Sequence, residues 1–351
     1  MKGSGSRSPA FGGGGQEGSA FGGGGAGDAA SDEESGLFFA QRGARLSPPD
    51  QAARRRREAR GETDLERVEV ELLLEAIYRV YGFDFRAYAY ASIKRRLWRR
   101  AQAEGLSTLS ALQERVLHDP ACMDRLMLDL SIQVTSMFRD PSFFRALRNQ
   151  VVPSLRTYPF IRVWHAGCST GEEVFSLAIL LREEGLYART RVYATDINET
   201  VLKSAREGIF PLSKMQEYTL NYQRAGGLRS FSEYYTARYE SARFDPTLME
   251  NVVCSQHNLV TDGSFSEFHL ILCRNVLIYF DRPLQSRVLG LFFDSLVNFG
   301  FLAIGRKENL RLAPDDADAS APVASRSRPS REPPVFEPFV GDERIYRRKE
   351  R

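Results

Sequence analysis

The clearest change in the hydrophobic pattern lies between residues 161 and 181, which read IRVWHAGCSTGEEVFSLAILL. Apolar, β-favouring residues at 161–164 predict a buried strand, and apolar residues at 174–181 recur with the spacing of a helix face. Gly167 and Gly171 bracket the turn between them. Glycine permits a positive φ and lets a ligand approach the backbone closely, so we expect a strand, a ligand-binding loop and a helix.

The composition of this loop restricts the ligand. Ser169 or Thr170 is expected to cap the helix that follows. The second glycine is not followed by the Lys-Ser or Lys-Thr pair of a phosphate-binding loop, and the three-glycine dinucleotide pattern is incomplete. Glu172 and Glu173 would compete with phosphate for the helix N-terminus, which favours a cationic ligand over a polyphosphate. The alternative is that both carboxylates only complement the helix dipole.

The strand and helix pattern then repeats. Residues 191–194 predict a strand that ends at Asp196, and residues 201–207 predict a helix, so we expect a parallel sheet with crossover helices. A carboxylate in this position can accept hydrogen bonds from both hydroxyls of a ribose. Asp196 is therefore the candidate ribose ligand, although it or Asn198 or Thr200 could instead cap the next helix.

The second half of the chain contains an aromatic-rich interruption, at residues 211–254, for which we expect an inserted, partly β subdomain. Residues 268–280 then predict a buried strand halted by Arg274 and Asn275, at the end where open sheets bind ligands. A helix at 284–298, a strand at 300–304 and a short strand at 344–346 that closes a sheet edge complete the predicted domain. Residues 313–335 have a composition typical of disorder.

The first 62 residues include two copies of AFGGGG and a run of four arginines. This composition cannot bury enough apolar surface to fold, so a disordered Gly/Arg-rich tail is expected at 1–62. A helical stripe begins near Asp64, and further helical patterns cover 106–117 and 122–130. These predict an N-terminal helical domain at 63–150 and a second domain at 151–351. Asp140-Pro141 is expected to restart a helix, with the aspartate as its cap.

One predicted helix of the N-terminal domain combines apolar residues with a dense cationic face. The basic residues are Lys94, Arg95, Arg96, Arg99 and Arg100. Three interpretations compete: a solvated face, a nucleic-acid surface and a docking site for an acidic protein. Aromatic residues do not alternate with the basic ones, and nucleic acid is therefore the least favoured partner.

Composition adds few further candidates. The chain has 351 residues, 42% of them hydrophobic, and a formal net charge of +3, as expected of an ordinary soluble protein. Its four cysteines and four histidines are scattered without metal-ligand or disulfide spacing, so we expect reduced, mostly buried thiols, structural or surface histidines, and no metal site. Apolar segments are too short for a membrane helix and no secretory signal is visible, which predicts a cytoplasmic protein.

Several motifs in series resemble the CheR-type chemoreceptor methyltransferases. They are YGFDF, IKRRLWRR, TSMFRDPSFF, VWHAGCSTGEEVFSLAILL, ATDINETVLKSAREGIF, the HNL at 257–259 and LCRNVLIYF. The resemblance implies an α/β, Rossmann-like class I methyltransferase sheet with an N-terminal all-helical domain and a small β subdomain at about 211–255. It also implies transfer of a methyl group from S-adenosylmethionine to glutamates of methyl-accepting chemoreceptors, which gives methyl esters.

The resemblance also assigns functional residues. Those at cofactor-contacting positions are Gln133, Thr135, Arg139, Glu173, Asp196, Asn258, Leu259, Arg274 and Asn275. Glu172 stays open as the alternative to Glu173, and Gly167 is added as a cofactor-binding residue from the reading of the loop. Arg139 and Tyr279 fall where the target carboxylate is handled, and the five basic residues of the cationic helix would dock the receptor. Gln133 replaces a more usual asparagine, and Arg306-Lys307 replaces a His-Ser pair.

The resemblance further implies a cytoplasmic monomer that reaches the membrane only through its receptors and binds no nucleic acid. Two alternatives stay open: a cofactor-binding adaptor without transferase activity, and a methyltransferase that acts on a different acceptor.

Overall fold

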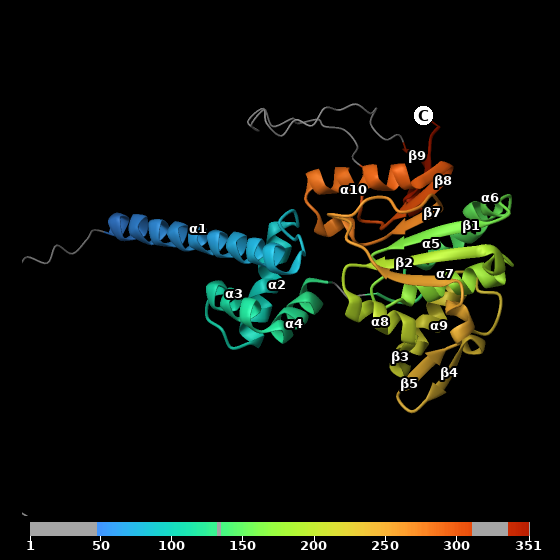
Figure 1. Ribbon diagram of the computed structural model, residues 1–351, viewed down its shortest axis with the longest axis horizontal. Coiled ribbons are helices and arrows are strands. Elements are labelled where there is room, and N and C mark those ends of the chain that lie inside the picture. Colours follow the sequence, from blue (N-terminus) through green and yellow to red (C-terminus); the bar gives the residue numbers. More distant parts are fainter. Residues whose placement is uncertain (1–47, 132–134, 311–335, 351) are drawn as a thin grey trace, which may run out of the picture. The chain divides into compact units, whose positions relative to one another are not determined.

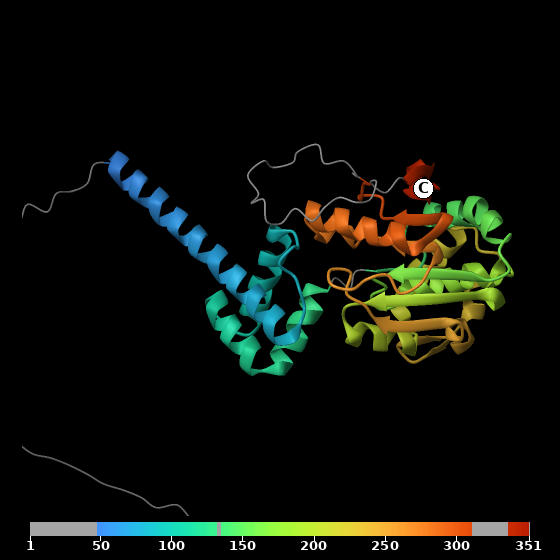
Figure 2. The same cartoon turned by 45° about the horizontal axis from the view of Figure 1, so that its top comes forward.

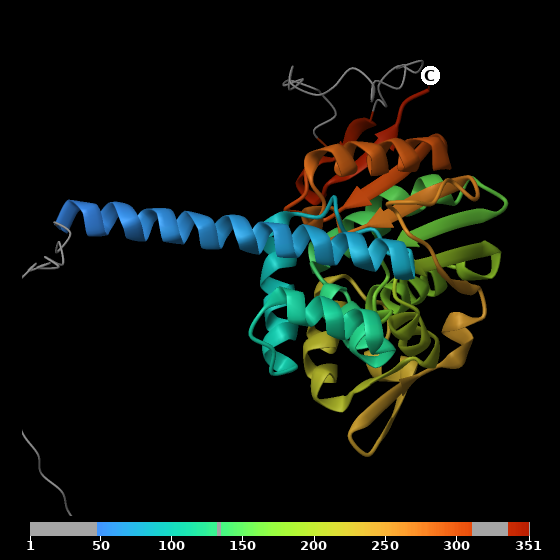
Figure 3. The same ribbon diagram turned by 60° about the vertical axis from the view of Figure 1, so that its left-hand side comes forward.

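The computed structural model describes residues 48–131, 135–310 and 336–350. Four helices come first along the chain: α1 (Pro48–Tyr81), α2 (Tyr90–Ala103), α3 (Leu109–His118) and α4 (Pro120–Leu130). Figure 3 shows α2, α3 and α4 packed together, and one apolar cluster joins them to the C-terminal half of α1 through residues such as Leu73, Leu97, Leu112 and Leu126. The predicted helical domain is therefore present.

Helix α1 begins at Pro48, well before the start expected near Asp64, so part of the predicted disordered tail is helical. The glycine-rich composition behind that prediction ends before this segment. Residues 50–60 are rich in Ala, Gln, Arg and Glu, which have high helix propensity, and a proline at the first helical position is favourable. The remaining tail, residues 1–47, lies outside the described residues, as does the whole segment at 313–335.

The described strands form a seven-stranded sheet in the order β6-β2-β1-β7-β8-β10-β9. The strands are β1 (Ile161–Ala166), β2 (Thr190–Asp196), β6 (Val252–Gln256), β7 (Phe268–Cys273), β8 (Leu296–Ile304), β9 (Phe336–Val340) and β10 (Ile345–Arg348). The first five in the spatial order run parallel, whereas β10 is antiparallel to β8 and to β9. Strands β1 and β2 lie side by side in Figures 1 and 2. The predicted Rossmann-like class is confirmed.

Two details of the sheet differ from the sequence-based expectation. The last strand, β10, lies inside the sheet, because β9 pairs with it and occupies the edge. Strand β8 begins at Leu296, within the segment predicted to be helical up to residue 298, because α10 (Arg282–Ser295) ends earlier. Apolar residues lie on both sides of Asp294-Ser295, at the end of α10 and the start of β8, so the periodicity alone does not locate this boundary.

Both faces of the sheet are covered. On one face, Ile161 and Val163 of β1 pack with α7 (Glu172–Glu183) in the largest apolar cluster. On the other, Trp164 packs with Phe292 of α10, which runs along the sheet in Figure 1. Helix α8 (Glu199–Glu207) connects β2 to the small sheet described below. Alternating residues of β1 thus serve the two layers, as expected of a parallel sheet buried on both sides.

The segment before β1 belongs to the core of the sheet domain. It comprises α5 (Pro141–Ala146), a π-helical turn (Leu147–Val151) and α6 (Val152–Leu155). Phe143 and Phe144 of α5 pack in the same cluster as Val163 and not with α1 to α4. Residues up to about 131 therefore pack with the helical domain, whereas residues from α5 onwards pack with the sheet domain. The sequence suggested that this boundary lies at residue 150.

The inserted subdomain is a second, three-stranded antiparallel sheet in the order β3-β5-β4. Its parts are β3 (Ile209–Pro211), α9 (Met215–Arg224), β4 (Tyr235–Arg238) and β5 (Ser241–Phe244). The β4–β5 hairpin is visible in gold in Figure 3. Strand β6 belongs to the large sheet, so the subdomain ends before Val252 and not at 255. Short 3-10 turns lie at Tyr187–Arg189, Leu212–Lys214, Phe231–Tyr234, Pro246–Met249, Leu277–Tyr279 and Gly341–Glu343. Within the described ranges, no helix is long and apolar enough to cross a bilayer.

Candidate functional site

A cavity of about 290 Å³ opens at the carboxyl ends of β1, β2 and β7. Eleven of the residues predicted to bind the cofactor or to handle the target carboxylate are described, and ten of them line the cavity: Thr135, Arg139, Gly167, Glu173, Asp196, Asn258, Leu259, Arg274, Asn275 and Tyr279. The eleventh, Glu172, does not, and Gln133 lies outside the described residues. Segments separated by more than a hundred residues thus meet at the edge where parallel sheets bind ligands.

The loop after β1 has the strained glycine geometry that its sequence indicates. Gly167 has a φ of +74°, and a Cβ built on it would lie 2.5 Å from Cγ2 of Val276, so only glycine fits without displacement. Gly171, at φ +94°, is the N-cap residue of α7. No side chain, of Ser169, Thr170 or any other described residue, accepts a capping hydrogen bond there. The expected side-chain cap is therefore wrong: the Thr170 hydroxyl bonds the Glu172 carboxylate instead, at 2.6 Å.

Asp196 ends β2 with its carboxylate held by the backbone. Oδ2 accepts the Ser169 N–H at 2.9 Å, and Oδ1 accepts the Asn198 N–H at 3.1 Å. Asn198, not Asp196, caps α8 by accepting the Thr200 N–H. Burial raises the pKa of Asp196. Each carboxylate oxygen has a second lone pair, so the fixed group can still accept from two hydroxyls in the cavity.

The two glutamates that open α7 have different surroundings. Glu173 lines the cavity; its Oε2 accepts from Arg274 at 2.6 Å and its Oε1 lies 3.3 Å from His165 Nε2. Burial would raise the pKa of Glu173, but the charge of Arg274 and contact with His165 hold it well below the usual value. Glu172 faces Thr170 and Tyr218, and burial raises its pKa. Only Glu173 is placed to bind a cation.

Arg274 connects this carboxylate to the segment before α5. Its side chain is 1% exposed, and its second terminal nitrogen donates to Asp140 Oδ2 at 2.6 Å. The predicted helix restart is confirmed, with Asp140 at the N-cap position of α5 and Pro141 in its first turn, but Asp140 has a φ of +56° and its side chain makes no capping bond. The ion pair with a buried guanidinium draws the carboxylate away from the helix N-terminus.

A second buried carboxylate shapes the loop that carries Asn275 and Tyr279. Glu308 accepts the N–H groups of Asn275 at 3.1 Å, Ile278 at 3.2 Å and Gly305 at 2.5 Å. Asn275 has a φ of +61°, which asparagine tolerates better than most residues. The sequence analysis noted Arg306-Lys307 as unusual but did not identify Glu308, the residue that follows them.

Tyr279 lies among cationic groups. The guanidinium carbon of Arg96 is 4.8 Å from the centre of its ring. Burial raises the pKa of Tyr279, although the charges of Arg96, Arg139 and Arg95 act in the opposite direction. The phenol therefore keeps its proton at neutral pH and can donate a hydrogen bond. This part of the cavity suits an anionic group.

Two of the histidines expected to be structural or at the surface, His165 and His257, line the cavity, as does Tyr88. His165 is buried near the end of β1, and its position two residues before Gly167 could have signalled this. Tyr88 packs edge-on against Phe280, with ring centres 5.0 Å apart. Nothing in the local pattern of residues 83–90 separates such a contact from ordinary core packing.

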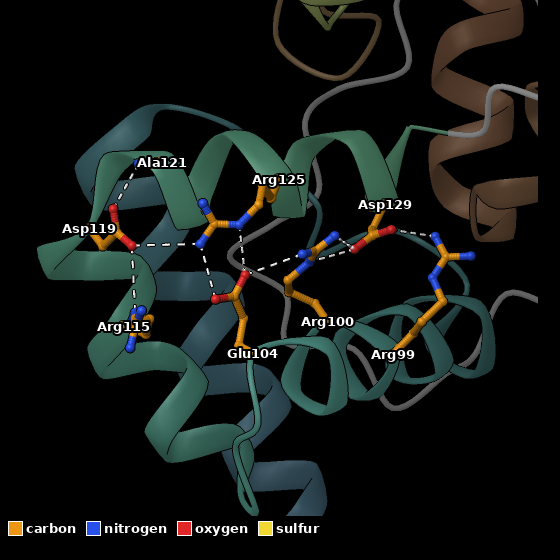
Figure 4. A network of polar contacts seen from close by, with 8 residues as sticks. All are labelled: Arg99, Arg100, Glu104, Arg115, Asp119, Ala121, Arg125 and Asp129. Atoms are coloured by element: carbon orange, nitrogen blue, oxygen red, sulfur yellow. Dashed lines mark hydrogen bonds and ion pairs between the residues drawn. The ribbon is translucent and has the colours of Figure 1, made fainter.

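Most of the cationic face of α2 is paired with acidic residues of the chain itself. Lys94 pairs with Glu66. Arg100 pairs with Asp129 at 2.5 Å and with Glu104 at 3.2 Å. Figure 4 shows the ion pairs of Arg99 and Arg100, in which Asp129 of α4 lies between the two arginines.

The other two basic residues of α2 differ sharply in exposure. Arg96 is buried and donates to the carbonyl of Leu130 at 2.5 Å. Arg95 is exposed. Helical periodicity places charges on a face but does not identify acidic partners that come from other helices, so the sequence did not show these ion pairs.

The cavity therefore combines an anionic interior with a cationic side. Glu173 and Asp196 can bind an ammonium and a pair of hydroxyls, and Arg139 and Tyr279 can bind a carboxylate. Among the residues that the structure describes, no group of His, Cys, Asp and Glu could hold a metal ion. The described cysteines are free, and three of the four are buried.

Comparison with known proteins agrees with this geometry. Residues 133–323 match the family model described as "CheR methyltransferase, SAM binding domain", and residues 69–131 match "CheR methyltransferase, all-alpha domain". "Putative methyltransferase Cher3" of Pseudomonas putida is 52% identical over 80% of this chain and 97% of its own length. The "Chemotaxis protein methyltransferase" of Salmonella typhimurium is 30% identical over 68% of this chain and 82% of its own. A protein with the same description from Listeria monocytogenes is 30% identical over 67% and 87%. The chain belongs to the CheR family of S-adenosylmethionine-dependent methyltransferases.

Proposed function

We propose that this protein transfers the methyl group of S-adenosylmethionine to glutamate side chains of methyl-accepting chemoreceptors. The observation that carries the proposal is the division of one cavity into an anionic part, at Glu173 and Asp196, and a cationic part, at Arg139 and Tyr279. A cofactor with an ammonium and a ribose fits the first part, and a glutamate carboxylate fits the second. The names of the relatives from Salmonella and Listeria support a role in chemotaxis.

The residues fit the cofactor in their donors and acceptors. Glu173 Oε1 is buried and lies 3.3 Å from His165 Nε2 without a well-formed hydrogen bond, so it would accept from the ammonium. Asp196 would accept from the ribose hydroxyls, and Gly167 leaves room for the ligand beside the backbone. When bound, S-adenosylmethionine supplies an activated methyl group on its sulfonium.

The reaction needs no strong base, because a glutamate with an ordinary pKa of about 4.3 is already ionised at neutral pH. The protein must instead align the carboxylate oxygen with the methyl carbon and sulfur, and positioning alone can contribute roughly 7 to 11 kcal/mol. Arg139 and the protonated phenol of Tyr279 would orient the two carboxylate oxygens. The exposed Arg95 would guide an acidic receptor helix towards them.

The protein would act in the cytoplasm as a monomer and meet the membrane only through its receptors. To test the proposal, purified protein is incubated with methyl-labelled S-adenosylmethionine and a membrane fraction that contains the host's chemoreceptors. We expect base-labile label on receptor bands, because methyl esters hydrolyse readily, and its loss with Arg139→Ala.

Three other outcomes would contradict the proposal. Turnover by Arg139→Ala at a rate near wild type would remove the assigned role of this residue. Cofactor binding without label would favour an adaptor. Base-stable label, or label on a different acceptor, would favour another methyltransferase activity.

A further inference from the structure

Arg139 lies between two residues in the left-handed region of backbone conformation. Phe138 has a φ of +48° and Asp140 a φ of +56°. Neither is glycine, and this conformation is sterically unfavourable for both. Such residues persist where their surroundings hold them, and they cluster at functional sites. The contacts on each flank of Arg139 therefore show what fixes its position.

The Phe138 flank is anchored to α7. The side chain is fully buried, and its ring lies 5.0 Å from that of Phe144 and 5.2 Å from that of Tyr222. Its N–H donates to the hydroxyl of Ser176 at 2.8 Å, and that hydroxyl donates to the Glu172 carbonyl at 2.7 Å. This side of the turn is held by packing and backbone hydrogen bonds.

The Asp140 flank is held by an ion pair. The residue after it is Pro141, which disfavours the right-handed helical conformation at position 140. The Asp140 carboxylate caps nothing and meets Arg274 at 2.6 Å. Asp140 is 29% exposed on its side chain and does not line the cavity. Any effect that it has on the reaction must pass through other residues.

Arg274 carries that effect to the cofactor side of the cavity. One terminal nitrogen binds Asp140, and the other binds Glu173 at 2.6 Å and lies 3.4 Å from the carbonyl oxygen of Arg139. The guanidinium also stacks 4.0 Å from the ring centre of Phe143. A buried, planar guanidinium with both ends engaged has little freedom to rotate. It fixes the distance between the two carboxylates.

We propose that Asp140 is a positioning residue for methyl transfer. Through Arg274, it fixes the position of the Arg139 backbone relative to Glu173. It thereby determines where the Arg139 guanidinium, which orients the substrate, lies relative to the cofactor. The inference rests on the proposed function, in which Arg139 orients the acceptor carboxylate and Glu173 binds the cofactor ammonium. Asp140 itself touches neither ligand.

Two substitutions separate the carboxylate from the backbone conformation. Asp140→Gly keeps the left-handed conformation accessible but removes the contact with Arg274. Asp140→Asn keeps both the conformation and an oxygen that accepts from Arg274. Asp245→Gly is the matched control, because Asp245 also precedes a proline and pairs with an arginine, Arg182, at 2.9 Å, but does not line the cavity.

The full-length variants are compared by receptor methylation, by calorimetry with S-adenosylhomocysteine, by thermal unfolding and by crystal structures with that product. We expect Asp140→Gly to lower kcat at least tenfold, to change the product Kd less than threefold and to displace the Arg139 guanidinium in the crystal. Asp140→Asn should retain kcat within threefold of wild type. Asp245→Gly should leave kcat within twofold.

The inference is overturned if Asp140→Gly keeps the wild-type kcat with Arg139 in place. It is also overturned if kcat falls in both glycine variants in proportion to their loss of melting temperature, or if product affinity falls as much as kcat. Failure of the proposed function is distinguishable. Wild-type protein would then methylate no receptor, while the crystal structures would still show whether Arg139 moves when the Asp140 carboxylate is removed.

Discussion

Glu172 and Glu173 are adjacent in the sequence, and both are buried, but only Glu173 lines the cavity. Replacing each in turn by glutamine is therefore a matched experiment on the cofactor site. Glu173→Gln removes the charge that would meet the cofactor ammonium but keeps the shape of the side chain. Glu172→Gln makes the same chemical change on the side facing Thr170 and Tyr218.

The size of the effect follows from the contact that is lost. A hydrogen bond to a charged group contributes about 1.5–3 kcal/mol, and about 1.4 kcal/mol corresponds to a factor of ten in affinity. Glu173→Gln should therefore weaken binding of S-adenosylhomocysteine, which retains the ammonium, by roughly 10- to 100-fold. Asp140 would still neutralise Arg274 in this variant. Because Glu172 does not line the cavity, we expect less than a threefold change in affinity for Glu172→Gln.

Isothermal titration calorimetry of both variants and the wild type measures these affinities directly, with thermal unfolding as the check on folding. Equal losses in the two variants would refute the assignment, because the effect would then reflect general damage to the start of α7. A larger loss for Glu172→Gln would show that the ammonium lies on the other side of the helix.

Three further changes test other parts of the account. Gly167→Ala adds a Cβ 2.5 Å from Val276 at a φ of +74°, so strain of roughly 1–2 kcal/mol should lower the free energy of unfolding and the melting temperature; an unchanged melting temperature would contradict the required glycine. Arg95→Glu should raise the KM for receptor severalfold without changing product affinity, and equal loss of both would argue against docking. Burial would raise the pKa of Glu183, but hydrogen bonds from groups including Tyr222 and Arg148 hold it below its usual value. The ionised carboxylate therefore stabilises the fold above about pH 4.5, and this stabilisation is lost as the pH falls through the folded-state pKa. Glu183→Gln should therefore lower the melting temperature at neutral pH and flatten its fall in acid, and an unchanged acid profile would refute this.

The sequence predicts most of the sheet because its signals are local. The apolar run of β1, the two glycines after it and the helical spacing of α7 each depend on a few neighbouring residues, and the structure has them in that order. The carboxyl ends of parallel strands share one edge, so Asp196 and Arg274 could be expected at the same site. The motif resemblance added Thr135 and Asn258, which come from loops with no distinctive local pattern.

The features that the sequence did not predict depend on contacts between distant residues. Asp140 was expected to cap a helix, and only the buried guanidinium of Arg274, 134 residues further along the chain, explains why its side chain does not. The sequence also does not show that Asp129 of α4 pairs with both Arg99 and Arg100 of α2. The choice between Glu172 and Glu173 likewise depends on which side of α7 faces the cavity, and a loop with two glycines does not fix that angle.

The most direct test of the central claim is peptide mapping of chemoreceptors by mass spectrometry after incubation with the protein and S-adenosylmethionine. We predict methyl esters on glutamate side chains of receptor helices, removed by mild base and absent when Arg139→Ala replaces the wild type. Receptor peptides without methylation, in a reaction where calorimetry shows the cofactor bound, would contradict the account.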